Sequence, residues 1–364
     1  VTARSTDFNM QDKVAASDGV ITGYGVIDNS LVYVYSQDAS ILGGTVGEMH
    51  AKKISRLYDM AVKMGAPVVA LVDCAGLRLE EAADALNAFG EVYAKQVAAS
   101  GVVPQITAVF GTCGGGMGVM ASLSDFTFMA EDGKLFVNAP NTLDGNRAEK
   151  CDTASAAYQA EVSGMADYTG TEDEVLAGIR QLVSVLPMNN DDFAEEQCAD
   201  DLNRVCENLA DCVGDTEIAL ENLADAGTFF EIKKAYAKNM VTGFMKLNGI
   251  TVGAVANRAT VYDEEGKAEE LGTALTAEGC EKAADFVNFC DAFNIPVLTL
   301  TNASGFAATV DNEKRIAKAA AKLTYAYAEA TVPKVNVVVG QAMGNAYNVM
   351  NSKACNADIV YAWP

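Results

Sequence analysis

The chain has 364 residues, of which half are apolar and 21% are charged. This composition provides material for about two packed domains, and it excludes a disordered chain or a small disulfide-stabilised protein. Asp and Glu number 49 against 26 Lys and Arg, which gives a net charge of −23. A body this acidic repels phosphate backbones and anionic lipids, so we expect no nucleic-acid partner.

The nine cysteines form no Cys-x-x-Cys pair, and His50 is the one histidine. Scattered thiols in odd number are typical of a reducing compartment, so a cytoplasmic protein is expected. A zinc site built from His and Cys at short spacing is not expected, and no other metal site is predicted. The uncharged run from Gln96 to Ser124 contains Pro104 and five glycines between 111 and 118, so it predicts strand, loop and helix rather than a membrane span.

The first elements of the chain alternate between strand and helix patterns. Apolar alternation predicts a hairpin over 19–35 that turns at Asp28-Asn29. The elements expected next are a helix over 50–64, a strand over 67–72, a helix over 80–99, a strand over 105–110 and a helix near 117–123. Strands interleaved with helices predict an α/β fold with a largely parallel sheet.

Residues 161–225 differ in composition, with seventeen acidic residues against two basic ones. Short amphipathic helices are expected over 175–186 and 202–209. We interpret this segment as a solvated acidic connector, and a partner-binding surface is the alternative.

From about residue 226 the first zone recurs. Pro296 follows Pro67 by 229 positions, and Gly305 follows Gly76 by the same number. The same offset joins Pro104 to Pro333, Gly111 to Gly340 and Gly115 to Gly344. A constant offset over some fifty residues predicts two copies of one α/β domain, at 1–160 and 226–364.

The strongest local feature is the glycine-rich segment from Phe110 to Gly118, which follows a predicted buried strand and precedes a predicted helix. Glycines let backbone N–H groups approach a ligand closely, and a helix N-terminus adds positive partial charge, so this turn could hold a phosphate or an oxyanion. No Lys follows the glycines, which excludes a P-loop. Tight packing between strand and helix explains the same glycines equally well.

The second copy places Val339 to Tyr347 at the matching position. Two such turns suit a reaction in which negative charge builds up on two oxygens. Neither copy shows a nucleophile motif, so proton transfer is expected to depend on a substrate or cofactor.

Other candidates are weaker. Gly43-Gly44, followed by Lys52, could seat a nucleotide phosphate or simply begin a helix. His50 is expected to be structural rather than a base. Asp73, Arg78 and Glu80 flank the Ala75-Gly76 turn, and a surface ion pair explains them as well as a functional role does.

Several longer motifs identify a family. In the first half they are residues 18–25, 43–44, 48–53, 65–67, 99–105, 113–116 and 124–129. In the second half they are residues 229–232, 236–239, 289–296, 325–334 and 361–364. In these segments the chain resembles the biotin-dependent carboxyltransferases, namely propionyl-CoA carboxylase β subunits and the related acyl-CoA decarboxylase α subunits.

The resemblance implies two duplicated crotonase-like domains, with acyl-CoA on the 1–160 side and biotin on the 226–364 side. One oxyanion hole is expected at Gly115 and Gly116, and the other at Asn345 and Ala346. The resemblance further implies cofactor-binding positions at Gly43, Gly44, Lys52, Ala75, Gly76, Gly305, Phe306 and Gly344. It places the substrate pocket at Tyr347 and Asn348. The ureido nitrogen of biotin is expected to take the proton from the acyl α-carbon.

The chain departs from the family at four places. Asn345 stands where a glycine is usual, and its Cβ restricts φ. The segment Ser304 to Ala308 lacks the usual Pro-Gly pairs, and Asn348 replaces a common Asp. Family members also continue beyond Tyr-Ala-Trp-Pro, so the second domain is expected to be truncated.

We therefore expect a carboxyltransferase that moves a carboxyl group between biotin on a separate carrier protein and the α-carbon of a short acyl-CoA. The expected partners are a biotin carboxyl carrier protein, either a biotin carboxylase or membrane sodium-pump decarboxylase subunits, and further copies of the chain. Two alternatives remain open. One is a biotin-independent crotonase-type hydratase or isomerase that uses Glu80 and Glu81, and the other is an assembly subunit without activity.

Overall fold

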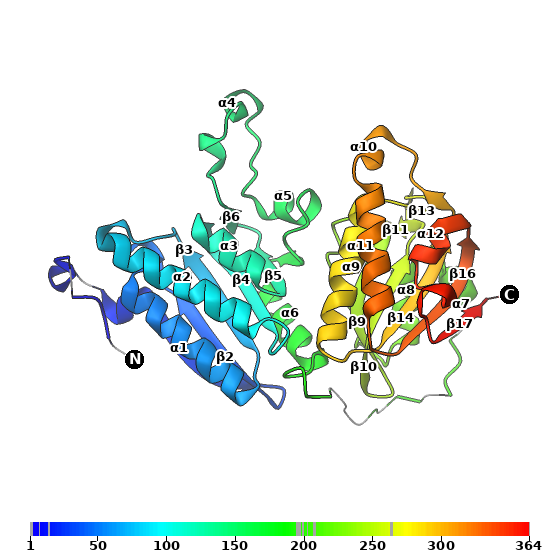
Figure 1. Cartoon of the computed structure of the whole chain (residues 1–364), viewed down its shortest axis with the longest axis horizontal. Coiled ribbons are helices and arrows are strands. Elements are labelled where there is room, and N and C mark those ends of the chain that lie inside the picture. Colours follow the sequence, from blue (N-terminus) through cyan, green and yellow to red (C-terminus); the bar gives the residue numbers. More distant parts are fainter. Residues whose placement is uncertain are drawn as a thin grey trace. The chain divides into compact units, whose positions relative to one another are not determined.

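The computed structural model describes residues 3–6, 8–13, 15–193, 198, 200–201, 203–206, 209–262 and 265–363. The chain divides into two compact units, Val1–Asn190 and Asp191–Pro364 (Figure 1). Residues 161–190 belong to the first unit and residues 191–225 to the second. The role of 161–225 as a connector stays a prediction.

The first unit is built on a sheet in the order β1-β2-β3-β4-β5-β7, with β6 paired to the end of β4. Its strands are β1 (Val20–Ile27), β2 (Ser30–Gln37), β3 (Val68–Cys74), β4 (Gln105–Gly114), β5 (Phe126–Ala130), β6 (Lys134–Phe136) and β7 (Tyr168–Gly170). The β1–β2 pair is antiparallel and every later pairing of this sheet is parallel. The carboxyl ends of β3 and β4 therefore lie at one edge, where loops can assemble a site.

Helices α1 (Glu48–Met64) and α2 (Ala82–Ala99) pack against each other on one face of this sheet (Figure 1). Helix α1 ends at Gly65, whose φ of 63° is easily reached by glycine. Helix α6 (Glu172–Val185) begins with a capping box between Thr171 and Glu174 and packs against β5 and β7. The remaining helices of this unit are α3 (Gly116–Leu123), α4 (Asn146–Glu149) and α5 (Ala156–Glu161).

The second unit contains a sheet in the order β8-β9-β10-β14-β16-β17. Its strands are β8 (Phe230–Ile232), β9 (Met240–Leu247), β10 (Ile250–Asn257), β14 (Val297–Ala303), β16 (Lys334–Ala342) and β17 (Ile359–Ala362). Short strands β11 (Thr260–Tyr262), β12 (Ala268–Glu270), β13 (Ala274–Leu275) and β15 (Gly305–Phe306) form two further pairs. The helices are α7 (Leu209–Cys212), α8 (Thr216–Leu223), α9 (Ala277–Ala292), α10 (Val310–Glu313), α11 (Ile316–Glu329) and α12 (Gly344–Val349).

The core of the second unit lies on both faces of its sheet. Leu220 and Ala224 pack with Val241, Met245 and Leu300 on the face covered by α8. On the other face Phe244 contacts Phe286 of α9, with ring centroids 4.9 Å apart. Helices α9 and α11 pack against each other, as α1 and α2 do in the first unit (Figure 1).

The two units repeat one fold, which confirms the predicted duplication. Strands β1 to β5 of the first sheet occur in the same order as β9, β10, β14, β16 and β17 of the second. The register also repeats, because Val68 pairs with Gln105 and Val297 pairs with Lys334, each exactly 229 positions later. A shared register shows that the offset in the sequence reflects equivalent strand pairing.

The predicted elements of the first zone are confirmed, with shifted ends. The hairpin turns at Asp28-Asn29, and both residues adopt positive φ. Helix α1 begins two residues before the predicted start, and β4 continues to Gly114 instead of ending at 110. The helix predicted over 175–186 corresponds to α6, whereas the one over 202–209 falls partly outside the described residues. None of the helices in the described ranges is long and apolar enough to cross a membrane.

Candidate active site

In the first unit the glycine turn joins the end of β4 to the start of α3. Gly115 has a φ of 60°, and Gly116 is the first residue of α3. The Tyr93 hydroxyl of α2 donates to the carbonyl of Gly116 at 2.9 Å, and a Cβ on Gly116 would lie 2.8 Å from that hydroxyl oxygen. Glycine at 116 therefore avoids a close contact with Tyr93, and Tyr93 fixes the turn although nothing in the sequence pattern singled it out.

The two N–H groups of this turn differ in availability. The Gly115 N–H donates to the carbonyl of Phe136 at 2.9 Å, so it is already engaged by β6. This differs from the prediction that both Gly115 and Gly116 direct N–H groups toward a ligand. Gly116 opens a helix, where the first N–H groups have no acceptor within the helix and the dipole favours negative charge.

The predicted loop at Ala75-Gly76 lies against this turn. Gly76 has a φ of 119°, and a Cβ there would lie 3.1 Å from the carbonyl oxygen of Gly114. A Cβ on Gly114 would in turn lie 3.1 Å from the Ala75 carbonyl oxygen. The structure thus brings 75–76 and 114–116 together, as expected for one site.

Gly43 and Gly44 form a turn that is bonded to the same loop. The Ala75 N–H donates to the Gly43 carbonyl at 3.0 Å, and a Cβ on Gly44 would lie 2.1 Å from the Asp73 carbonyl oxygen. This close approach accounts for the glycine at 44 without a ligand. Lys52 is half exposed and pairs with Glu48 one helical turn earlier.

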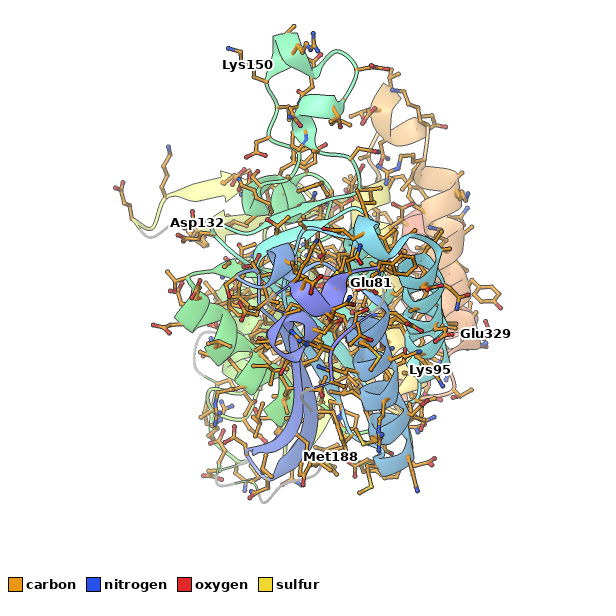
Figure 2. All side chains as sticks on the ribbon, turned by 90° about the vertical axis from the view of Figure 1, so that its left-hand side faces the viewer. Glu81, Lys95, Asp132, Lys150, Met188 and Glu329 are labelled. Atoms are coloured by element: carbon orange, nitrogen blue, oxygen red, sulfur yellow. The ribbon has the colours of Figure 1, made fainter. Side chains whose placement is uncertain are left out.

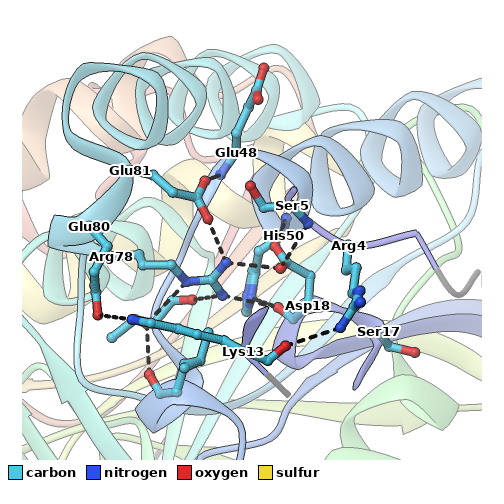
Figure 3. A network of polar contacts seen from close by, with 12 residues as sticks. Arg4, Ser5, Lys13, Ser17, Asp18, Glu48, His50, Arg78, Glu80 and Glu81 are labelled. Atoms are coloured by element: carbon cyan, nitrogen blue, oxygen red, sulfur yellow. Dashed lines mark hydrogen bonds and ion pairs between the residues drawn. The ribbon is translucent and has the colours of Figure 1, made fainter. Parts of the chain in front are cut away.

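Arg78 is the centre of a buried ionic network (Figure 3). Its side chain is fully buried, and Nη1 lies 2.9 Å from Asp18 Oδ1 and 2.8 Å from Glu81 Oε1. Nη2 donates to the Thr45 carbonyl at 2.8 Å, and Glu81 Oε2 accepts from the Glu48 N–H. The interpretation that Arg78 belongs to a surface ion pair is therefore wrong. The guanidinium instead ties together the loop after β3, the loop before α1 and the segment before β1.

Glu80 and Glu81 have separate environments. Glu80 is exposed and pairs with Lys13 at 2.8 Å, whereas both oxygens of Glu81 are used inside the network. Glu81 lies inside the body of the first unit, while Lys150 lies at the outer end of the loop that carries α4 (Figure 2).

His50 is structural, as the sequence suggested. It is fully buried, its Nδ1 donates to the Asp18 carbonyl at 2.9 Å, and its Nε2 accepts from Gln37 Nε2 at 3.1 Å. Burial disfavours the charged imidazolium and lowers the pKa of His50 to about 4. The ring is therefore neutral at physiological pH and makes structural contacts.

This low pKa predicts acid sensitivity. Because the unfolded chain has a His pKa near 6.5, the unfolded state binds the proton first as the pH falls. The fold should therefore lose about 3 kcal/mol through this group between pH 6.5 and pH 4, with no loss above that window. Denaturant titrations of the protein and of His50→Gln should show a smaller loss over this window in the variant. Equal loss in both proteins would contradict the assignment.

In the second unit the corresponding turn lies between β16 and α12. The Met343 N–H donates to the Ala303 carbonyl at 2.9 Å, and Gly344 has a φ of 56°. Asn345 lies within α12 and is not among the residues with positive φ, so its Cβ adds no backbone strain. The restriction expected from Asn345 therefore does not arise, because the left-handed position is Gly344.

The other candidates of the second unit gather at the same turn. Gly305 and Phe306 form β15, which lies against α12 and pairs with β13. Asn348 Nδ2 donates to Asn345 Oδ1 at 3.4 Å, and Tyr347 lies between them in the helix. The structure thus brings together the positions that the sequence assigned to the second site.

The two cysteine thiols near the first turn are poorly suited to act as nucleophiles. Burial raises the pKa of the Cys74 thiol to about 11 and raises that of Cys113 further. Among the described residues no cluster of His, Cys, Asp and Glu could hold a metal ion.

Comparisons with known proteins identify the family. A family model described as the carboxyl transferase domain matches residues 1–364. The chain is 43% identical to the propionyl-CoA carboxylase beta chain of Roseobacter denitrificans, covering all of this chain and 72% of that one. It is 39% identical to the methylmalonyl-CoA decarboxylase subunit alpha of Propionigenium modestum, covering 99% and 71%. A solved structure of transcarboxylase 12S, a hexamer with hydrolysed methylmalonyl-coenzyme A bound, superposes with a TM-score of 0.90 at 34% identity, covering 100% and 71%.

These likenesses and the duplicated fold define the class of protein. The chain belongs to the carboxyl transferase family. It is a biotin-dependent acyl-CoA carboxyltransferase with two crotonase-like units, which uses a coenzyme A thioester and biotin carried on a separate protein.

Proposed function

We propose that the first unit binds the acyl-CoA thioester at the turn of α3, and that the second unit binds biotin at the turn of α12. The observation that carries this proposal is the recurrence of one glycine turn, at the same strand register, in both units. Two equivalent turns suit two carbonyl groups that both gain negative charge during carboxyl transfer.

The first turn is proposed to stabilise the enolate of the acyl group. Gly115 shapes the turn while its N–H is held by Phe136, and Gly116 donates its N–H to the thioester oxygen. The dipole of α3 adds to this interaction. The hydrogen bond from the Tyr93 hydroxyl of α2 to the Gly116 carbonyl holds this donor in place.

The second turn is proposed to stabilise the ureido oxygen of biotin through the N–H groups of Asn345 and Ala346. The two residues lie in the first turn of α12, where N–H groups have no acceptor within the helix. No heavy atom lies within 4 Å of a Cβ built on Gly305 or Gly344, so the space beside both glycines is open. When bound, biotin carries the carboxyl group and supplies the base that the described residues lack.

The substrate is proposed to be a short acyl-CoA of the acetyl, propionyl or methylmalonyl type. The relatives named above are a propionyl-CoA carboxylase chain and a methylmalonyl-CoA decarboxylase subunit. Tyr347 and Asn348 are proposed to line the acyl pocket, with the amide of Asn348 in place of a carboxylate.

The structure weakens the two alternatives. A hydratase or isomerase needs two positioned carboxylates, yet Glu81 is consumed by Arg78 and Glu80 lies at the surface with Lys13. The alternative of an inactive assembly subunit rests on Asn345 and on the missing Pro-Gly pairs near Ser304, and the backbone of Asn345 is compatible with the helix.

The partners are proposed to be a biotin carboxyl carrier protein together with a biotin carboxylase or membrane sodium-pump decarboxylase subunits. All nine cysteines are free, which supports a cytoplasmic location. Further copies of the chain are proposed to form a dimer or a trimer of dimers, with composite sites between copies. Tyr325 of α11 and Met343 are more than half exposed and are candidates for that interface.

The experiment that tests this function is transfer of a labelled carboxyl group from malonyl-CoA or methylmalonyl-CoA to free biotin. The full chain should transfer label from both short esters, and longer malonyl-type esters should react at least tenfold more slowly. Hydration of an enoyl-CoA without biotin, in place of label transfer, would support the hydratase alternative and overturn the proposal.

A further inference from the structure

In both units a hydrogen bond lies just before the glycine turn, and it is not part of the proposed oxyanion hole. In the first unit β3 and β4 pair at Val72 with Val109 and resume at Cys74 with Cys113. Asp73 therefore faces three residues of β4, 110–112, in a β-bulge. Such a bulge leaves backbone N–H groups without a partner strand and bends the strand that carries it.

The side chain of Asp73 fills this bulge. Its Oδ1 accepts from the Thr112 N–H at 2.9 Å, and a Cβ on Gly111 would lie only 2.2 Å from the same oxygen. The carboxylate therefore occupies the space that a side chain at 111 would need. Gly115, where the chain turns into α3, is three residues beyond Thr112.

The second unit repeats this arrangement with a different side chain. The β14–β16 register breaks between Thr301 and Ala303, opposite 339–341. Asn302 Oδ1 accepts from the Gln341 N–H at 2.9 Å, and a Cβ on Gly340 would lie 2.5 Å from that oxygen. A carboxylate and an amide thus perform the same contact, which shows that the acceptor oxygen is what the bulge requires and the charge is not.

We propose that Asp73 and Asn302 are positioning residues, each of which sets the glycine turn of its own unit and hence the binding of that unit's ligand. This inference rests on the proposed function, in which the first turn holds the acyl-CoA and the second holds biotin. Neither side chain touches a ligand in this account. Each acts through the strand end, and a displacement of about 1 Å at a reacting group is enough to cost about 100-fold in rate.

The kinetic test uses label transfer from malonyl-CoA to free biotin. Asp73→Ala should raise the KM for malonyl-CoA about tenfold and leave the KM for biotin within about twofold, while Asn302→Ala should do the reverse. Asp73→Asn should restore both constants to nearly those of the unmodified chain, because Asn302 shows that an amide fits. Asp59→Ala, at an exposed ion pair with Lys95, is the matched control and should change neither constant.

A double-mutant cycle separates positioning from general damage. Gly111→Ala should act by displacing the Asp73 carboxylate, so its effect should resemble that of Asp73→Ala. The double variant should then be no worse than either single variant, because the new methyl group occupies the space that Asp73 left. Multiplied losses in the double variant, or equal changes in both KM values for Asp73→Ala, would overturn the inference.

Hydrogen exchange tests the inference without measuring catalysis, so its result does not depend on the proposed function. In Asp73→Ala, hydrogen exchange at the Thr112 amide should accelerate at least about tenfold, with the Gln341 amide unchanged; Asn302→Ala should show the opposite pattern. Unchanged exchange at both amides would refute the contact. Failure of the unmodified chain to transfer label, with the exchange pattern as expected, would refute the proposed function and leave the positioning of the turns intact.

Discussion

Gly116→Val should lower kcat/KM for label transfer by about 10²–10³, which is the cost typical of losing one oxyanion donor. The physical reason is steric, because the first atom of the new side chain would lie 2.8 Å from the Tyr93 hydroxyl and 3.1 Å from the ring of Phe89. The turn must shift to relieve these contacts, and the N–H moves with it. Steady-state kinetics of carboxyl transfer measure the effect.

Gly90→Val is the matched control for this prediction. Gly90 also lies in a helix, but no heavy atom lies within 4 Å of a Cβ built there. The control variant should therefore keep its activity within about twofold. Full activity of a correctly folded Gly116→Val protein would show that the thioester does not bind at this turn.

Arg78→Met should destabilise the fold by about 3–5 kcal/mol, the usual result of removing one partner from a buried ion pair. Asp18 and Glu81 would remain buried with two negative charges close together and no compensating guanidinium. For a unit of this size the loss corresponds to a fall in Tm of about 10 °C. Thermal unfolding followed by circular dichroism measures it.

The control for the buried arginine is Arg180→Met. Arg180 is more than half exposed, and its ion pair with Asp28 has an N–O distance of 3.7 Å. Its loss should change the free energy of unfolding by less than about 0.5 kcal/mol. Similar Tm values for the two variants would contradict the structural role assigned to Arg78.

The architecture was largely predictable because it is encoded twice. The offset between Pro67 and Pro296 predicted the repeat, and the structure shows the same strand order and the same register in both units. Strand ends were less predictable. Strand β4 continues past 110 because a bulge at Asp73 lets pairing resume at Cys113, and no periodicity in the sequence signals such an interruption.

The candidate site was predictable in position but not in hydrogen bonding. The glycine pattern located both turns, yet the engagement of the Gly115 N–H by Phe136 depends on the tertiary path of β6. Tyr93 acts from a neighbouring helix and carries no local motif. Asn302 could have been found, because it follows Asp73 by the same 229 positions that relate the other paired residues.

The central claim is that the chain moves a carboxyl group between biotin and a short acyl-CoA. In this account backbone N–H groups at the two glycine turns stabilise the negative charge that develops. Label transfer measured with and without free biotin tests it most directly. We expect methylmalonyl-CoA to lose its labelled carboxyl group to biotin, no transfer when biotin is omitted, and loss of at least 99% of the rate in Gly116→Val. Equal loss of the labelled carboxyl group with and without biotin, or an unchanged rate in Gly116→Val, would contradict the account.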